Sequence, residues 1–337
     1  MIILVTGGTG FIGSHTCCLL LEQGHDVVVV DDLSNSSYEV INRISIITGK
    51  KIKFIKGSIL NFELLDRLFI KYNFDAVIHF AGSKAVGESF LKPIHYYQNN
   101  VIGAITLINV MKKYNTKKLI FSSSATVYGE NAPIPYKEIY GRGNITNPYG
   151  RTKAIIEQII EDYSKSNLKF SAIILRYFNP IGAHESGLLG ESPLGIPNNL
   201  LPIILQVATK KKKYLSIYGN DYNTKDGTCR RDYIHIMDLA RGHIKALNSK
   251  HEGLNYFNLG TGRPYSVFEI LKSFEENNKI IIKYKIEKKR LGDLPEFWAD
   301  SSKAKKELNW VAEKNLDSMM IDAWRWQKNN PLGYDTK

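Results

Sequence analysis

The chain has 337 residues, 43% of them hydrophobic, which predicts a globular protein with one large domain and a smaller one. Its formal net charge of +12 comes from lysines dispersed along the chain without a nucleic-acid-binding motif, so we expect a basic surface suited to an anionic ligand and no nucleic-acid partner. No stretch approaches the roughly 20 apolar residues that cross a membrane, and the opening apolar run is too short for a signal peptide, so we expect a cytoplasmic protein with no membrane partner.

The chain opens with the apolar run Ile2-Ile3-Leu4-Val5, followed by Thr6-Gly7-Gly8-Thr9-Gly10-Phe11-Ile12-Gly13. A short apolar run bounded by glycine predicts a strand covered on both faces, as in the middle of a parallel sheet. Gly7, Gly10 and Gly13 would allow a tight turn, a close approach to a pyrophosphate and close packing of helix on strand. The helix that follows would point its free N–H groups at that pyrophosphate.

A second apolar run, residues 27–30, ends in Asp31-Asp32. The glycines alone would also fit an ordinary turn, but a carboxylate after the second strand is the further mark of a dinucleotide site. Such a carboxylate accepts a hydrogen bond from the ribose 2′-hydroxyl and repels a 2′-phosphate. The sequence therefore favours NAD over NADP.

The three cysteines predict neither a disulfide framework nor a metal site. Cys17 and Cys18 are adjacent in the first predicted helix, and Cys229 is distant in the sequence. This spacing matches no zinc site. We expect three buried, apolar side chains and no bound metal.

Short apolar runs then alternate with longer segments of helical periodicity, which predicts an α/β fold with a doubly wound parallel (Rossmann) sheet and right-handed crossovers. The further strands are expected at 52–56, 76–80, 118–122 and 172–176, and helices at 64–72, 98–114 and 149–164. Ligands of such sheets bind beyond the carboxyl ends of the strands.

Polar residues follow three of these strands. The first set is Ala81-Gly82-Ser83-Lys84, the second Ser122-Ser123-Ser124 and the third Tyr177-Phe178-Asn179-Pro180. Because parallel strands end at one edge of the sheet, we expect these hydroxyl, amide and ammonium groups to converge on one crevice.

The segment Asn147-Pro148-Tyr149-Gly150-Arg151-Thr152-Lys153 carries the candidate catalytic pair. Proline favours a helix entry, and Tyr149 and Lys153, four residues apart, share one helix face. A lone pair of this kind is more often a surface feature. Together with the dinucleotide motif and the serines, however, it predicts that Lys153 lowers the pKa of Tyr149 toward neutrality, which makes it a general acid or base.

Beyond Pro180 the sequence predicts a smaller C-terminal α/β domain that binds the substrate. Residues 181–198 are rich in Gly, Pro, Ser and Asn, as in a loop, and the later apolar segments are shorter. Two arginines that meet in a crevice would bind a diphosphate bidentately. The polar candidates here are Asn199, Tyr218, Arg231, Arg290 and Asp293.

Nearly end to end, the chain resembles the UDP-glucose 4-epimerases, a family of extended short-chain dehydrogenases/reductases. The resemblance rests on residues 7–15, Ala85-Val86-Gly87-Glu88-Ser89, residues 122–129 (SSSATVYG), residues 179–184 (NPIGAH), 226–228 with 231–235, and Leu308-Asn309-Trp310. It implies tightly held NAD, reversible interconversion of UDP-glucose and UDP-galactose by inversion at carbon 4, and a place in galactose metabolism. It also implies a homodimer formed through helices at 98–114 and 149–164.

The resemblance further implies site residues. The catalytic residues would be Tyr149, Lys153 and Ser124. NAD would contact these three and Gly7, Gly10, Phe11, Ile12, Gly13, Asp31, Asn35, Ser36, Ser58, Ile59, Phe80, Ala81, Lys84, Asn99 and Phe178. The UDP-sugar would contact Lys84, Ser124, Tyr149, Asn179, Asn199, Leu200, Tyr218, Arg231, Arg290, Asp293 and Phe297. We expect a dinucleotide-binding domain over 1–177, with a segment near 232–260 returning to it, and a mainly UDP-sugar-binding domain over 178–337.

Two positions bear on how the chain compares with the family. Ser58 stands where the family usually has an acidic residue that contacts adenine, which affects the expected affinity for NAD rather than the identity of the cofactor. Phe297 is a bulky aromatic where a small residue would admit N-acetylated hexoses, so we expect poor turnover of those substrates.

Two alternative functions remain to be weighed. The related 4,6-dehydratases carry an Asp-Glu pair just after the strand-end hydroxyl, where this chain has Ala125 and Thr126, which cannot titrate. A non-catalytic NAD-sensing protein would be expected to lack one of Ser124, Tyr149 and Lys153. The sequence therefore favours epimerisation over both.

Overall fold

The computed structural model describes residues 1–195, 197, 199–290 and 293–335. Its centre is a seven-stranded sheet in the order β3-β2-β1-β4-β5-β6-β10, in which every pairing is parallel. The strands are β1 (Ile2–Thr6), β2 (Asp26–Asp31), β3 (Lys53–Lys56), β4 (Ala76–His79), β5 (Lys118–Ser124), β6 (Ser171–Tyr177) and β10 (Leu254–Leu259). The order reverses between β1 and β4, which is where such sheets bind their ligands.

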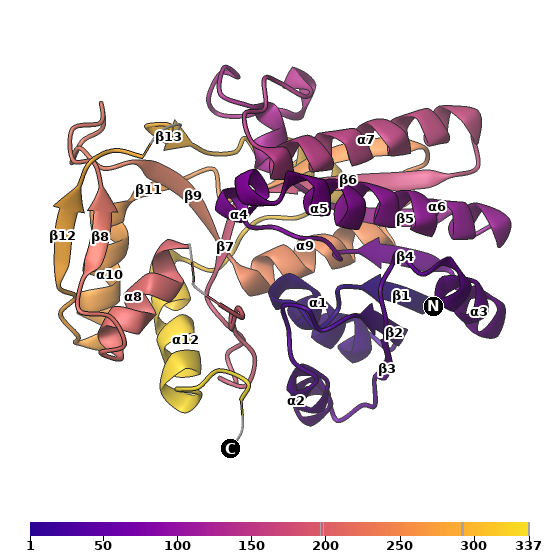
Figure 1. Cartoon of the computed structure of the whole chain (residues 1–337), viewed down its shortest axis with the longest axis horizontal. Coiled ribbons are helices and arrows are strands. Elements are labelled where there is room, and N and C mark those ends of the chain that lie inside the picture. Colours follow the sequence, from indigo (N-terminus) through magenta and orange to yellow (C-terminus); the bar gives the residue numbers. More distant parts are fainter. Residues whose placement is uncertain (196, 198, 291–292, 336–337) are drawn as a thin grey trace.

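Helices cover both faces of the sheet (Figure 1). One face packs on α1 (Phe11–Glu22), α2 (Glu39–Thr48) and α9 (Ile236–Asn248). The other packs on α3 (Phe62–Tyr72), α6 (Gly103–Lys113) and α7 (Pro148–Ser166). Alternate residues of one strand enter the two cores, Ile3 and Val5 the first and Leu4 the second. This explains why residues 2–5 of β1 are all apolar.

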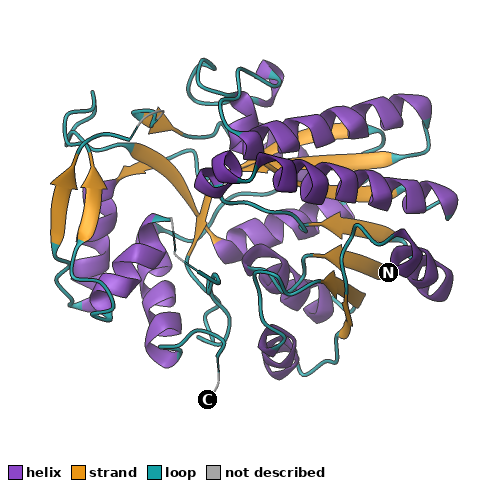
Figure 2. Cartoon of the chain, viewed as in Figure 1, coloured by secondary structure: helices purple, strands orange, loops and turns teal. Residues whose placement is uncertain are grey.

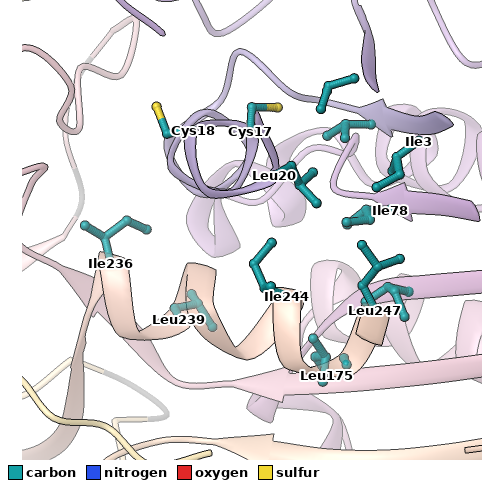
Figure 3. Packing of buried hydrophobic residues seen from close by; sticks show 14 of the residues in the cluster. Ile3, Cys17, Cys18, Leu20, Ile78, Leu175, Ile236, Leu239, Ile244 and Leu247 are labelled. Atoms are coloured by element: carbon teal, nitrogen blue, oxygen red, sulfur yellow. The ribbon is translucent and has the colours of Figure 1, made fainter. Parts of the chain in front are cut away.

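The first core joins segments that are far apart in the sequence. Figure 3 shows side chains of α1, including Cys17, Cys18 and Leu20, above those of α9, including Ile244. Cys17 and Cys18 are fully buried, as predicted, whereas Cys229 is partly exposed. The prediction of burial was wrong for Cys229, which lies in a loop before β9 rather than on a core face.

The doubly wound parallel sheet predicted from the sequence is confirmed, with differences at element ends. The helix expected at 98–114 is divided into a π-helical segment, η1 (Tyr97–Ile102), and α6. Strand β5 continues through Ser124, two residues beyond its predicted end. Strand β10 joins the sheet beside β6, so the chain returns to this sheet after leaving it.

The remaining elements form a smaller α/β unit, seen beside the sheet in Figure 2. One sheet contains β7 (Asn179–Ile181), β9 (Arg230–His235), β11 (Pro264–Ser266) and β13 (Glu296–Phe297), and a second pairs β8 (Leu215–Tyr218) with β12 (Tyr284–Glu287). Helices α8 (Leu200–Ala208), α10 (Val267–Asn278) and α12 (Leu316–Asn329) share a separate apolar core with them. The domain boundaries at 177 and 178 stay a prediction.

The short elements pack mainly on the larger unit, against α7 or β10. They are α4 (Val86–Leu91), α5 (Pro93–Tyr96), η2 (Ala125–Tyr128), η3 (Glu138–Tyr140) and α11 (Ser302–Leu308). Across the described part of the chain, none of the helices is both long and apolar enough to traverse a bilayer.

Candidate active site

The turn between β1 and α1 contains glycines that no larger residue could replace without displacing neighbouring backbone atoms. A Cβ atom on Gly7, where φ is +70°, would lie 2.6 Å from the Ala81 nitrogen, and one on Gly13 would lie 2.3 Å from the Gly7 carbonyl oxygen. Gly10 is the N-cap of α1 and supplies no side-chain cap. Phe11 and Ile12 begin the helix beside it, and the first-turn N–H groups are available to an anion.

The carboxylate of Asp31 lies beside this turn. It accepts hydrogen bonds from the backbone nitrogen of Thr9 at 3.1 Å and from the hydroxyl of Ser36 at 3.1 Å, while Thr9 and Ser36 share a 2.7 Å bond. Asn35 Oδ1 accepts from the Leu194 nitrogen, at 3.0 Å, and so touches the second half of the chain. The glycine cradle, the helix N-terminus and the acid at the end of β2 together fit a dinucleotide.

Other predicted cofactor residues follow β3 and β4. Ser58 Oγ accepts from the Leu60 nitrogen at 3.2 Å, and Ile59 is buried against Gly103 at the start of α6. Phe80 packs on the His243 ring with centroids 4.7 Å apart. Ala81 N donates to the Thr6 carbonyl at 3.1 Å, and Asn99 Nδ2 donates to Ser83 Oγ at 3.2 Å. These residues extend along the same edge of the sheet as the glycine turn.

Ser124, Tyr149 and Lys153 come together between β5 and α7. Asn147 caps α7 by accepting from the Gly150 nitrogen at 2.7 Å, and Pro148 occupies the first helical turn. Lys153 Nζ donates to the carbonyl of Ser122 at 2.7 Å and lies 6.0 Å from the centroid of the Tyr149 ring. Tyr149 and Ser124 are hydrogen-bonded and 9% exposed, and Lys153 is 5% exposed.

The expected lowering of the pKa of Tyr149 by Lys153 was wrong for the chain alone. Burial raises the pKa of Tyr149 to about 12, and only the hydrogen bond with Ser124 opposes it. Burial also lowers the pKa of Lys153 to about 8, which the charge of Glu157 partly offsets. The physical reason is that both groups are removed from water, which disfavours both the phenolate and the ammonium.

Four predicted substrate residues form a linked group in the smaller unit. Asp293 accepts from Arg290 Nε at 2.8 Å and lies 3.7 Å from an Arg231 nitrogen. The guanidinium of Arg290 lies 4.7 Å from the centroid of the Tyr218 ring. The structure thus brings together residues of β8, β9 and the segment before β13, with two guanidinium groups that can bind a diphosphate.

An acidic residue that sequence reasoning missed connects two other candidates. Glu191 Oε1 accepts from Lys84 Nζ at 3.2 Å and from Asn199 Nδ2 at 3.4 Å. Asn199 precedes α8, whose first residue is Leu200. Because Lys84 and Glu191 are 107 positions apart, no local pattern in the sequence could have paired them.

Aromatic rings line the boundary between the two units. Phe297 lies 5.2 Å from Phe178 and 4.9 Å from Tyr136, measured between ring centroids. Tyr136, which sequence reasoning also missed, is almost fully buried. Asn179 lies in β7 opposite Tyr233 of β9, so the strand that follows Phe178 leads directly into the smaller unit.

The two positions that distinguish dehydratases carry no acid–base pair. Ala125 is 1% exposed, and Thr126 donates its backbone nitrogen and its hydroxyl to Ser124 Oγ at 3.3 and 3.0 Å. Thr126 therefore orients the serine instead of supplying a titrating group.

Comparison with known proteins agrees with this geometry. The sequence model of the GDP-mannose 4,6 dehydratase family matches residues 4–323. A UDP-glucose 4-epimerase of Haemophilus influenzae is 56% identical, with 99% of each chain covered. The crystal structure of a Bifidobacterium longum UDP-glucose 4-epimerase in complex with NAD+ and UDP aligns with a TM-score of 0.95 at 49% identity, covering 99% of this chain and 100% of that one.

A second solved structure, a Stenotrophomonas maltophila UDP-glucose 4-epimerase with bound NAD and formylated UDP-arabinopyranose, aligns with a TM-score of 0.96 at 42% identity. It covers 98% of this chain and 99% of its own. The resemblance inferred from the motifs is thus confirmed over the full length. The chain belongs to the family of extended short-chain dehydrogenases/reductases that the sequence model describes, and within it to the UDP-glucose 4-epimerases.

Proposed function

We propose that this protein interconverts UDP-glucose and UDP-galactose reversibly, by inversion at carbon 4 through a transient 4-keto sugar, with NAD as its tightly bound cofactor. One observation carries the proposal. The buried Ser124, Tyr149 and Lys153 lie at the end of β5, on the same sheet edge as the glycine turn. A relative that is 56% identical and is named a UDP-glucose 4-epimerase supports it.

Side chains of the protein itself transfer the proton of the sugar 4-hydroxyl. NAD, when bound, supplies a nicotinamide that accepts a hydride and returns it. The Tyr149 oxygen takes the proton of the sugar 4-hydroxyl and later gives it back, and Ser124 bonds the same sugar oxygen. Burial holds the pKa of Tyr149 at about 12 in the chain alone, where Lys153 does not lower it. We therefore infer that the phenolate forms only with the ligands bound, stabilised by the Lys153 ammonium, which lies 6.0 Å from the ring centroid.

The protein must bind the nucleotide more firmly than the hexose, so that the 4-keto sugar can turn and present its other face to the nicotinamide. Arg231 and Arg290 can bind the diphosphate with paired hydrogen bonds. The hexose needs a weaker hold, because firm binding of one face would stabilise the ground state and prevent the 4-keto sugar from turning over. We assign the nucleotide to the group around Asp293 and the hexose to the space near Phe297.

The test is incubation of the purified protein with UDP-galactose and no added NAD, followed by identification of the product. We expect UDP-glucose. A dehydratase would give a 4-keto-6-deoxy sugar, and an NAD-sensing protein would return the UDP-galactose unchanged. Either result would contradict the proposal.

We also propose a homodimer, formed through the segment 98–114 and helix α7. Apolar side chains face outward there: Ile102 is 49% exposed, and Ile105 and Ile155 are each 38% exposed. Exposed apolar side chains that cluster on neighbouring helices are typical of a subunit interface.

Sedimentation should therefore give a dimer mass, and Ile105→Lys should shift it toward the monomer. Ile46→Lys, at an exposed position of α2, is the matched control and should leave the dimer intact. A monomer for the unaltered protein would remove this inference.

A further inference from the structure

The face of α7 that carries Tyr149 and Lys153 continues into a third buried group. Glu157 is four residues beyond Lys153, so the three side chains recur on one face of the helix. Glu157 is 0% exposed. A buried carboxylate is costly unless it is paired and hydrogen-bonded, so its partners are informative.

The partners of Glu157 come from the two strands beneath the helix. Ser123 Oγ of β5 donates to Glu157 Oε1 at 2.6 Å, and Arg176 of β6 donates Nε to Oε1 at 3.0 Å and Nη2 to Oε2 at 2.7 Å. Arg142 lies further away, at 3.9 Å. Figure 1 shows α7 running along β5 and β6. One carboxylate therefore fixes α7 to both strands.

These contacts lie next to the catalytic groups on both sides. Ser123 is flanked by Ser122, whose carbonyl accepts from Lys153, and by Ser124, which bonds Tyr149. We propose that Glu157 is a positioning residue of the active site, which sets the register of α7 on β5 and β6 and places a negative charge one helical turn from the Lys153 ammonium. This inference rests on the function proposed above.

The electrostatic surroundings support the second part of this role. Burial lowers the pKa of Lys153 and Glu157 raises it, with a net value of about 8. The other titratable groups around this face are His79 on β4, whose pKa falls to about 3, Tyr177 and Arg176 on β6, Tyr96 on α5 and Glu88 on α4. Arg142 lies beyond them, and the rings of Tyr128 and Tyr256 lie against the Arg176 guanidinium. Among these groups Glu157 is the carboxylate whose charge raises the pKa of Lys153, whereas Glu88 bonds Lys92 and Tyr96.

Two substitutions separate the effect of the length of the Glu157 side chain from the effect of its charge. Glu157→Gln keeps the length of the side chain and removes the charge, so Lys153 should lose its proton at lower pH and the alkaline limb of the kcat profile should move to lower pH. Glu157→Asp keeps the charge and shortens the reach, so kcat should fall roughly 10- to 100-fold, as for a small misplacement of catalytic groups, while the alkaline limb and KM stay unchanged.

Ser123→Ala removes one hydrogen bond to Glu157 but leaves its ion pair with Arg176 in place. It should therefore lower kcat less than Glu157→Asp does. Glu161→Gln, one turn further along α7, is the matched control and should match the unaltered protein in both readouts. NAD content and thermal unfolding report whether each variant is folded.

Unchanged kcat and pH profiles in folded Glu157→Gln and Glu157→Asp would overturn the inference. Should Glu157→Gln not fold, unchanged kcat in both Glu157→Asp and Ser123→Ala would overturn it instead. The unaltered protein is assayed alongside, and its failure to convert UDP-galactose would count against the proposed function and not against this role.

Discussion

Tyr149 shows how far a single residue could be interpreted from sequence. Its spacing from Lys153 and its place after the serines of β5 identified the candidate pair, because four-residue spacing and strand ends are visible in the sequence. Its pKa was not predictable in this way. Burial raises it to about 12, and burial depends on packing from α4, α5 and the strands.

Tyr149→Phe tests the proton-transfer role directly. The ring stays in its buried site while the acceptor oxygen is lost, so kcat should fall roughly 10²- to 10⁴-fold, the usual contribution of a general acid–base group. Binding of UDP, measured by calorimetry, should be nearly unchanged. A kcat close to that of the unaltered protein would exclude Tyr149 from the proton transfer.

We propose that Phe297 limits the space next to the hexose. Its ring packs on Tyr136 and Phe178, and replacing it with a small side chain would open that volume. Phe297→Ser should raise the ratio of turnover on UDP-N-acetylglucosamine to turnover on UDP-glucose, measured with both substrates at equal concentration. Comparable turnover of the two by the unaltered protein would contradict the expectation that Phe297 excludes N-acetyl groups.

Glu191, Tyr136 and Glu157 were not predictable at this scale. Each looks like an ordinary acidic or aromatic residue in the sequence, and each acquires its role from contacts with distant segments. Lys84, for example, is 107 positions from Glu191. Residues of this kind become apparent only once the fold is known.

At the scale of elements, apolar runs and glycines located most of the central strands. The exceptions have physical causes. The segment 98–114 reads as one helix by periodicity, but its first part is π-helical, and a local widening of this kind leaves no clear periodic signal. Strand β13 has only two residues, Glu296 and Phe297, and exists because β9 offers a partner edge.

The turn from β1 to α1 can be tested as an element. In Gly13→Ala the new Cβ would lie 2.3 Å from a backbone oxygen and 2.8 Å from the Gly8 Cα, so the helix must move off the strand. The purified variant should lose its NAD, and its free energy of unfolding should fall by about 1–3 kcal/mol. Gly87→Ala in α4 is the control, because a Cβ there meets nothing within 4 Å, and full NAD content in both variants would argue against the glycine cradle.

At the scale of the whole molecule, the sequence indicated the parallel sheet and a second unit, whereas the return of β10 to the sheet depends on long-range pairing. The same packing buries histidines from several elements. Burial lowers the pKa of His15 and His79 to about 3 and of His243 to about 4, from an ordinary value of 6.5. These side chains stay neutral in the folded protein.

A pH dependence of stability follows. Above pH 6.5 the buried histidines are neutral in both the folded and unfolded states, so they contribute no dependence. Below it these histidines bind protons in the unfolded chain but stay neutral in the folded chain. The free energy of unfolding therefore falls by up to about 1.4 kcal/mol per pH unit for each histidine. Urea unfolding at about pH 7 and about pH 5.5, a window above the ordinary carboxyl pKa values, should show lower stability at the lower pH. Equal stability would contradict the neutral burial of these side chains.

The most direct test of the central claim follows one hydrogen atom through the reaction. UDP-galactose that carries deuterium at carbon 4 is incubated with the purified protein without added NAD, and the product is examined by mass spectrometry and NMR. We predict UDP-glucose that retains the deuterium at carbon 4, because the hydrogen leaves and returns within one closed site. Loss of the deuterium to water, or a product altered at carbon 6, would contradict the account.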